Sequence, residues 1–142
     1  MTPLASADVN VGTELPPLTR TVTQEQVKAY AEAAGDPNPI HTDPELARAF
    51  GFPAPIAHGM LNLAILTEAV ASWAGGYDRV ASISVRFSKP LIVGDTITCT
   101  GRVTDVDTAA QVASLDVEAV SDRGDRVLTN GRATVRLSPS QR

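Results

Sequence analysis

One short segment of the chain gathers side chains that could transfer protons. Residues 35–43 read Gly-Asp-Pro-Asn-Pro-Ile-His-Thr-Asp, which places Asp36 and His41 on a loop that two prolines keep out of a helix. A carboxylate and an imidazole held close together can bind one water molecule and manage both ends of a proton transfer. Taken alone, the same residues also fit an ordinary turn in which neither side chain has a chemical role.

A second segment, residues 56–60, reads Ile-Ala-His-Gly-Met and lies where a long apolar helix is predicted to begin. The first N–H groups of a helix have no partner within it and lie at the positive end of its dipole. A carbonyl oxygen placed there gains hydrogen bonds, and Gly59 has no side chain to block its approach. The segment therefore fits an oxyanion-binding site, and it fits equally a tight turn in front of the helix.

Other chemistries fit these residues less well. The side chains that could bind a metal ion are Asp36, His41, Asp43 and His58, but the spacings typical of metal sites, such as His-Glu-x-x-His or Cys-x-x-Cys, are missing from the sequence. The sequence also has no Gly-x-Ser-x-Gly motif and no glycine-rich phosphate loop. The only cysteine, Cys99, falls within a predicted strand, where a buried inert thiol is expected. We therefore do not expect a metal site.

Three helices are predicted before the strands. Thr23 and Gln26 form a capping-box pair at the start of the first helix, which ends at Gly35. The second is short and covers residues 44–50, with a proline at its first position. The third covers about residues 60–74 and is apolar on nearly all sides, so we expect it to be buried.

Beyond the third helix the hydrophobic period changes to two, which is typical of strands. The predicted strands cover residues 80–87, 96–106, 111–120 and 127–137. Their alternation gives the sheet one buried face and one wet face, the usual antiparallel pattern. Asn130-Gly131 is either a turn or a bulge within the last strand. The order of elements indicates an α+β protein in which a curved antiparallel sheet wraps a buried helix.

Length and composition limit the possible partners. The 142 residues suit a single domain, 1–142, with its core at about 11–137. The net charge is −4, and no basic stripe alternates with aromatic residues, so nucleic acid is not an expected partner. The apolar run at 60–74 is shorter than the roughly 20 residues that cross a bilayer, and the N-terminus does not resemble a secretory signal. We expect a cytoplasmic protein with no membrane partner.

Several motifs together resemble one known family. They are the segments 35–43 and 56–60, with 85–90 (Val-Arg-Phe-Ser-Lys-Pro) and 93–95 (Val-Gly-Asp). All four resemble motifs of the (R)-specific enoyl-thioester hydratases, also called MaoC-like dehydratases, and the resemblance covers about residues 11–137. It implies a hot-dog fold of the single-domain type, in which the sheet wraps the long helix.

The resemblance also implies roles for individual residues. Asp36 and His41 match the catalytic pair of the family, and Gly59 matches the backbone N–H that binds the substrate carbonyl. Asn38 and His58 match positions that support the catalytic loop. No metal ligand is implied.

The activity implied by the resemblance is hydration of trans-2-enoyl thioesters and dehydration of (3R)-hydroxyacyl thioesters in fatty-acid metabolism. The chain would be a hydro-lyase without a cofactor, acting on acyl groups carried by coenzyme A or by acyl carrier protein. It would form a homodimer by edge-to-edge pairing of sheets, or else serve as the catalytic subunit of a heterodimeric (3R)-hydroxyacyl-carrier-protein dehydratase. A hot-dog thioesterase using Glu68, or a non-catalytic acyl-binding subunit, is less favoured.

Overall fold

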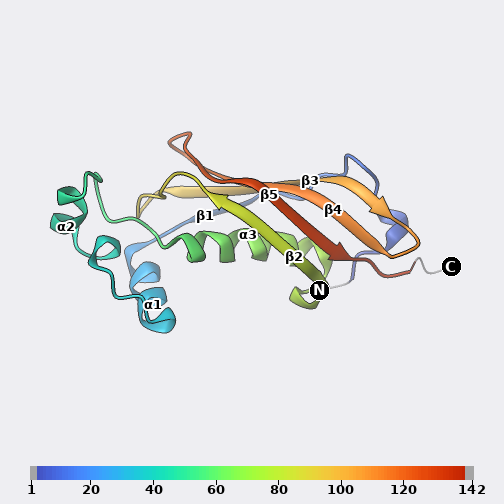
Figure 1. Cartoon of the computed structure of the whole chain (residues 1–142), viewed down its shortest axis with the longest axis horizontal. Coiled ribbons are helices and arrows are strands. Elements are labelled where there is room, and N and C mark those ends of the chain that lie inside the picture. Colours follow the sequence, from blue (N-terminus) through green and yellow to red (C-terminus); the bar gives the residue numbers. More distant parts are fainter. Residues whose placement is uncertain (1–2, 140–142) are drawn as a thin grey trace.

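A computed structural model describes residues 3–139, in which one long helix lies against one face of an antiparallel sheet (Figure 1). The helices are α1 (Gln24–Ala34), α2 (Pro44–Ala49) and α3 (Gly59–Ala74). The strands are β1 (Leu18–Thr21), β2 (Val80–Phe87), β3 (Thr96–Asp107), β4 (Val112–Ser121) and β5 (Arg126–Arg136). Single turns of 3-10 helix are η1 (Ser6–Asp8), η2 (Pro39–His41) and η3 (Tyr77–Arg79). These elements confirm the predicted α+β class.

The sheet has the strand order β1-β3-β4-β5-β2, with every neighbouring pair antiparallel, so β1 and β2 are its edges. The four predicted strands are present. The short edge strand β1 was not predicted. Hydroxyl hydrogen bonds join it to β3, between Thr19 and Thr98 (3.3 Å) and between Thr21 and Thr96 (2.8 Å). The polar side chains of β1 therefore stabilise an edge that lacks a long apolar run.

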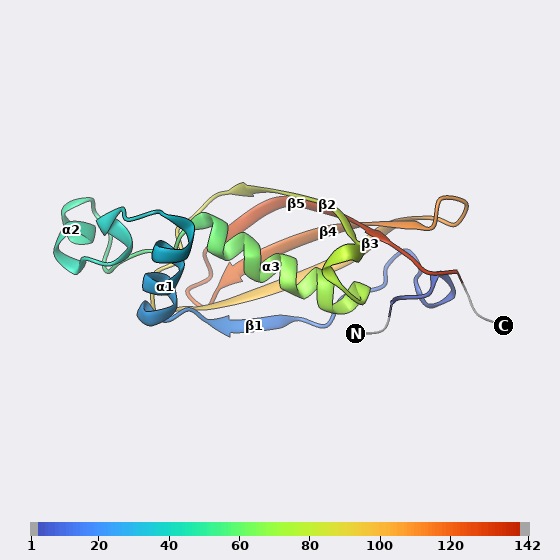
Figure 2. The same ribbon diagram turned by 90° about the horizontal axis from the view of Figure 1, so that it is seen from below.

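Helix α3 is buried, as its composition predicts, and crosses beneath the sheet (Figure 2). The larger apolar side chains that it buries are Leu61, Ile65, Leu66 and Val70. Full burial of each is worth about 1.5–3 kcal/mol relative to exposure. The main core of the protein thus lies between α3 and the inner face of the sheet.

Within residues 3–139 no helix is long and apolar enough to cross a membrane.

The termini of α1 place the loop that follows it. The Thr23 hydroxyl accepts a hydrogen bond from the Gln26 N–H (3.2 Å), but no return bond from the Gln26 side chain is present among the described residues, so only half of the predicted capping box forms. Gly35 ends the helix in the left-handed conformation (φ 69°). Helices α1 and α2 lie beyond the N-terminal end of α3 (Figure 1). The loop between them, residues 35–43, therefore lies beside the first turn of α3.

The pair Asn130-Gly131 forms a bulge within β5, which settles the two alternatives that the sequence left open. Asn130 has a positive φ of 49°, and the pairing of β4 with β5 shifts between Val117 and Ala119. A Cβ atom added at Gly131 would collide with the carbonyl oxygen of Val117. The close approach of the two strands at the bulge therefore requires glycine.

Candidate active site

The loop after α1 is held by hydrogen bonds between its own residues. The Asp36 carboxylate (Oδ1) accepts from the Asn38 N–H (3.3 Å), and the Asn38 side chain accepts from the Ile40 N–H (3.2 Å) to open the 3-10 turn. The Gln24 side chain of α1 donates to the carbonyl oxygen of His41 (2.9 Å). These contacts fix the backbone from Asp36 to His41 and leave the Asp36 carboxylate half-exposed.

One hydrogen bond sets the proton position on His41. Its ring is buried, and Nδ1 lies 2.6 Å from the carbonyl oxygen of Ile56. Because a carbonyl oxygen only accepts, Nδ1 must carry the proton and donate it, so Nε2 of the neutral ring has a free lone pair. That Nε2 lies 3.9 Å from Asp36 Oδ2. The ring is therefore oriented with its basic nitrogen toward the carboxylate.

His58 packs directly on this pair. It is the N-cap residue of α3 and only 3% exposed, and its ring stacks on that of His41 with centroids 3.7 Å apart and planes at 24°. Its Nε2 lies 3.8 Å from Asp36 Oδ2, and the centroid of its ring lies 4.8 Å from that of the Tyr30 ring. Burial lowers the pKa of His58, and His41 lowers it further, while the backbone oxygen and the charge of Asp36 oppose the shift. The second histidine thus favours the neutral form.

This shift predicts how stability depends on pH. The unfolded chain takes up a proton at His58 more readily than the folded chain, so the contribution of this group is fully present above about pH 6.5 and is lost as the pH falls below that value. We expect wild type to lose more free energy of unfolding than His58→Gln between about pH 7.5 and 5.5. Urea unfolding at both pH values measures the difference. Equal losses in the two proteins would show that His58 does not titrate in this way.

The first residue of α3, Gly59, is covered by an aromatic ring. A Cβ atom added to it would lie 2.9 and 3.0 Å from two ring carbons of Phe87, which is too close for a real side chain. As the first helical residue, Gly59 has no acceptor within α3 for its N–H, and none is present elsewhere in residues 3–139. A small polar ligand atom could accept this hydrogen bond at the positive end of the helix.

The arrangement fits acid–base chemistry better than metal binding. Ligand atoms of Asp36, His41 and His58 lie within 4.8 Å of one another. However, the two imidazole rings are stacked with their planes at 24°, so their lone pairs lie in nearly parallel planes, which disfavours convergence on one ion. By contrast, the 3.9 Å gap between Asp36 Oδ2 and His41 Nε2 is too long for a direct hydrogen bond and suits one bridging water molecule.

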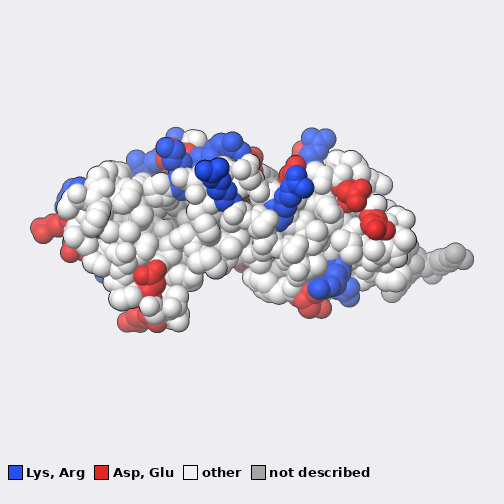
Figure 3. Space-filling model, viewed as in Figure 1, with Lys and Arg blue, Asp and Glu red and all other residues white. Residues whose placement is uncertain are grey.

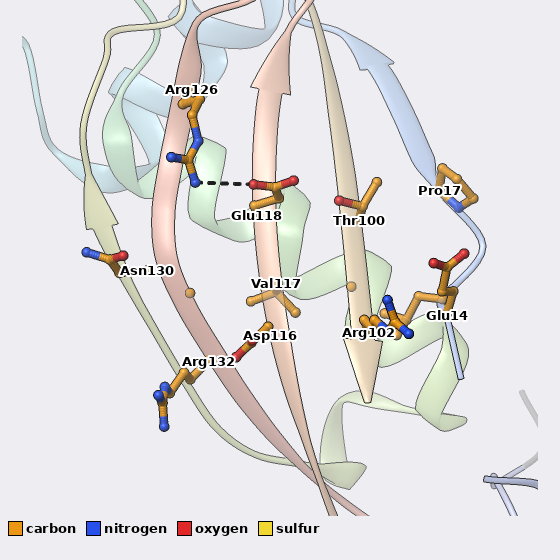
Figure 4. A pocket seen from close by; sticks show the side chains of 13 residues that line it. Glu14, Pro17, Thr100, Arg102, Asp116, Val117, Glu118, Arg126, Asn130 and Arg132 are labelled. Carbon is orange, nitrogen blue, oxygen red and sulfur yellow. Dashed lines mark hydrogen bonds and ion pairs between the residues drawn. The ribbon is translucent and has the colours of Figure 1, made fainter. Parts of the chain in front are cut away.

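A hollow lies on the face of the sheet opposite α3, away from Asp36, His41 and His58. Figure 4 shows its charged side chains, among them Arg102, Asp116, Glu118, Arg126 and Arg132. Arg126 and Glu118 form an exposed ion pair of 3.4 Å. An exposed pair of this kind contributes little stability. No histidine lines this hollow, and the carboxylates and arginines neutralise one another, so it offers no proton-transfer pair.

The MaoC like domain family matches residues 8–123, which is most of the chain. The chain belongs to the MaoC-like family. This membership, together with the structural likenesses given below, confirms the predicted hot-dog fold.

Relatives of this MaoC-like chain include enzymes. The 3-hydroxyacyl-thioester dehydratase X of Mycobacterium tuberculosis is 40% identical over 72 residues, covering 51% of this chain and 25% of the relative. The (R)-specific enoyl-CoA hydratase of Aeromonas caviae is 31% identical over 113 residues, covering 79% and 84%. The chain spans only 25% and 47% of the length of the first two curated relatives that it matches.

Solved structures of MaoC-like proteins superpose on most of this chain. An (R)-hydratase of A. caviae involved in PHA biosynthesis matches with a TM-score of 0.83 and 29% identity, covering 92% of this chain and 98% of its own. The ChsH1-ChsH2 complex of M. tuberculosis matches with a TM-score of 0.80 and 25% identity, covering 91% and 98%.

The structure gives no support to the thioesterase alternative for this MaoC-like chain. Glu68 lies nine residues after Gly59, about 13 Å along α3. Its carboxylate is paired with Arg20 of β1 at 2.7 Å, so it does not face the N-terminal end of the helix as a nucleophile would.

Burial raises the pKa of Cys99 to about 12, which agrees with the inert thiol expected from the sequence.

The candidate site contains contacts that the motifs did not indicate. Tyr30 and Gln24 of α1 brace His58 and the backbone of His41, and Phe87 covers Gly59. Tyr30 fits the apolar helical spacing of α1 and therefore reads as a core residue. Phe87 lies in segment 85–90, one of the motifs that resemble the family. That motif was the sequence signal that the end of this strand lies near the site.

Proposed function

We propose that the chain is a hydro-lyase that hydrates trans-2-enoyl thioesters to (3R)-hydroxyacyl thioesters and catalyses the reverse dehydration in fatty-acid metabolism. The observation that carries this proposal is the 3.9 Å separation of Asp36 Oδ2 from a His41 Nε2 whose lone pair is free. The unpartnered N–H of Gly59 supplies the second requirement, a hydrogen-bond donor for the thioester carbonyl. The names of the relatives support the same reaction.

In the proposed mechanism, the thioester carbonyl accepts a hydrogen bond from the Gly59 N–H. This contact polarises the conjugated double bond and stabilises the enolate-like transition state; removal of one such donor typically costs about 3–4 kcal/mol of that stabilisation. Asp36 and His41 hold the attacking water. The pair enters this step with one proton on the Asp36 carboxyl group. His41 Nε2 takes one proton of the water as the water oxygen bonds to C3, and Asp36 gives its own proton to C2. Transfer of a proton from His41 to Asp36 then restores the pair.

Supporting roles belong to the two remaining predicted residues. Asn38 braces the loop by accepting from the Ile40 N–H, and His58 keeps the His41 ring in place by stacking. Because His58 favours the neutral form, it adds no positive charge that would compete with His41 for the proton. Both residues act through the catalytic pair and need not touch substrate.

The proposed substrate carrier is coenzyme A or acyl carrier protein, and the proposed working unit is a homodimer. The edge strand β2 supports the homodimer. It is eight residues long, and the backbone groups on its outer side have no partner in the sheet, so a second copy of the chain could pair there. Heterodimerisation with a second hot-dog subunit is the alternative, and the likeness to the ChsH1-ChsH2 complex supports it.

The two enantiomers of 3-hydroxybutyryl-CoA, supplied separately, test the proposal. We expect the (3R) form to lose water and produce the absorbance of the conjugated enoyl thioester, while the (3S) form remains unchanged. The (3S) form alone reacting would contradict the proposed stereochemistry. If neither reacts with the chain alone, the homodimeric CoA-hydratase form of the proposal is wrong, and the assay is repeated with a carrier-protein thioester.

A further inference from the structure

A second, smaller hollow lies where β2 ends beside the start of β5. The residues that line it are Arg86–Lys89, Gly124–Arg126, Thr129 and Asn130. They bring together three cationic side chains and one carboxylate. Lysine and arginine side chains gather along the upper margin of the molecule in Figure 3, over the outer face of the sheet, although the chain as a whole has a charge of −4. The hollow is thus locally positive.

Two of its three cations have no ion-pair partner. Arg86 and Lys89 are exposed, and no carboxylate lies within 4.0 Å of either in residues 3–139. Arg126 is held by Glu118 at 3.4 Å, an exposed pair that Figure 4 marks. The Asp125 carboxylate lines the same hollow. Positive charge is therefore in excess here and is available to an anionic ligand.

The strand end that carries these side chains is rigid. The Ser88 N–H donates to the Val127 carbonyl (3.0 Å), and the Lys89 N–H donates to the Arg126 carbonyl (3.2 Å). The Ser88 and Thr129 hydroxyls are hydrogen-bonded at 2.5 Å. The cations thus extend from paired backbone whose position does not have to be ordered when a ligand binds.

The hollow also borders the candidate active site. Phe87 lines it, and the ring of the same residue covers Gly59, the proposed donor to the thioester carbonyl. Phe87 is 51% exposed, which is unusual for a large apolar side chain. Lys89 follows two residues later, at most about 7 Å along the chain. A ligand that extends from Gly59 across the Phe87 ring therefore leads toward the end of β2, where the cations lie.

We propose that this hollow binds the phosphate of the pantetheine arm that carries the acyl group, with Arg86 and Lys89 as its main ligands. The inference rests on the proposed function, because a thioester of phosphopantetheine has both a carbonyl for Gly59 and a phosphate at the far end of its arm. Arginine and lysine bind phosphate by charge-assisted hydrogen bonds. The apolar ring of Phe87 packs against the arm between the two ends. Coenzyme A and phosphopantetheinylated carrier protein share this chemistry.

Calorimetric titration with thiol compounds tests the site without requiring turnover. We expect wild type to bind 4′-phosphopantetheine at least about tenfold more tightly than pantetheine, since hydrogen bonds to charged groups contribute more than neutral ones. The double variant Arg86→Gln, Lys89→Gln is expected to lose that difference. The matched control is Arg132→Gln, which removes one exposed charge of β5 outside this hollow and should keep the difference.

Each outcome decides the inference. Equal affinities for the two compounds in wild type, or an equal loss in the double variant and in the Arg132 control, would overturn it. Titration with coenzyme A then separates the sources: affinity equal to that for phosphopantetheine assigns the site to the phosphate shared with carrier protein, and an added gain that the double variant loses assigns it to the nucleotide phosphates as well. Binding that shows the phosphate effect in a protein without hydratase activity would contradict the proposed function alone.

Discussion

Replacing His41 with glutamine is expected to lower kcat for hydration of crotonyl-CoA about a thousandfold, within the range that loss of a general base usually costs. Glutamine can still donate to the Ile56 carbonyl that accepts from His41 Nδ1, so the loop should remain folded. It has no basic nitrogen to take the proton of water. Asp36→Asn should have a similar effect, because the amide cannot pass a proton to C2. Steady-state rates followed by enoyl absorbance measure both losses.

The double variant Asp36→Asn, His41→Gln provides the control for a shared role. Residues that act as a unit give non-additive effects, so the double variant should be about as slow as the slower single variant. Thermal unfolding should change little, since Asp36 is half-exposed and His41 keeps its acceptor. A folded single variant that retains more than about a tenth of the wild-type kcat would exclude that residue from the proton transfer.

The largest effect on stability is expected from Gly131→Ala. The new Cβ would clash with the carbonyl oxygen of Val117. It would also lie 2.8 Å from Val117 Cγ2 and 3.0 Å from the Val117 carbonyl carbon. Two of these atoms belong to the backbone of β4, which cannot move aside without breaking the β4–β5 pairing. We expect a loss of about 3 kcal/mol in the free energy of unfolding, the upper part of the usual range for overpacking. Urea unfolding measures it.

Gly101→Ala is the matched control on the other side of the same strand. Its Cβ would lie 3.1–3.3 Å from side-chain atoms of Val117 and Leu15, which can shift by a few tenths of an ångström. The loss should therefore be clearly smaller, about 1 kcal/mol. Equal effects of the two substitutions would contradict the close backbone approach at the bulge beside Asn130.

Much of the fold follows from local signals. The caps Thr23 and Asp43 each accept a backbone hydrogen bond at the predicted helix start, and the apolar run of α3 is buried. Strand β1 gives no such signal, because four residues after two prolines are too few to show a period of two. It is defined by pairing with β3, about 80 residues later in the chain, which only the folded structure brings together.

The candidate site was predictable in its residue types but not in its geometry. The loop 35–43 and the helix start are each evident as motifs, and the prolines indicate a constrained loop. The stacking of His58 on His41 and the bond from His41 to Ile56 depend on how α1, the loop and α3 pack. These contacts fix which nitrogen of His41 is free, and no spacing in the sequence determines that choice.

The most direct test of the proposed hydration is to add crotonyl-CoA to the purified chain and to follow enoyl absorbance and free thiol in the same reaction. We expect the absorbance to fall to an equilibrium value with no release of thiol, and His41→Gln to remove the change. A release of thiol that matches the loss of thioester would instead show hydrolysis and contradict the assignment of Asp36 and His41 to addition of water across the double bond.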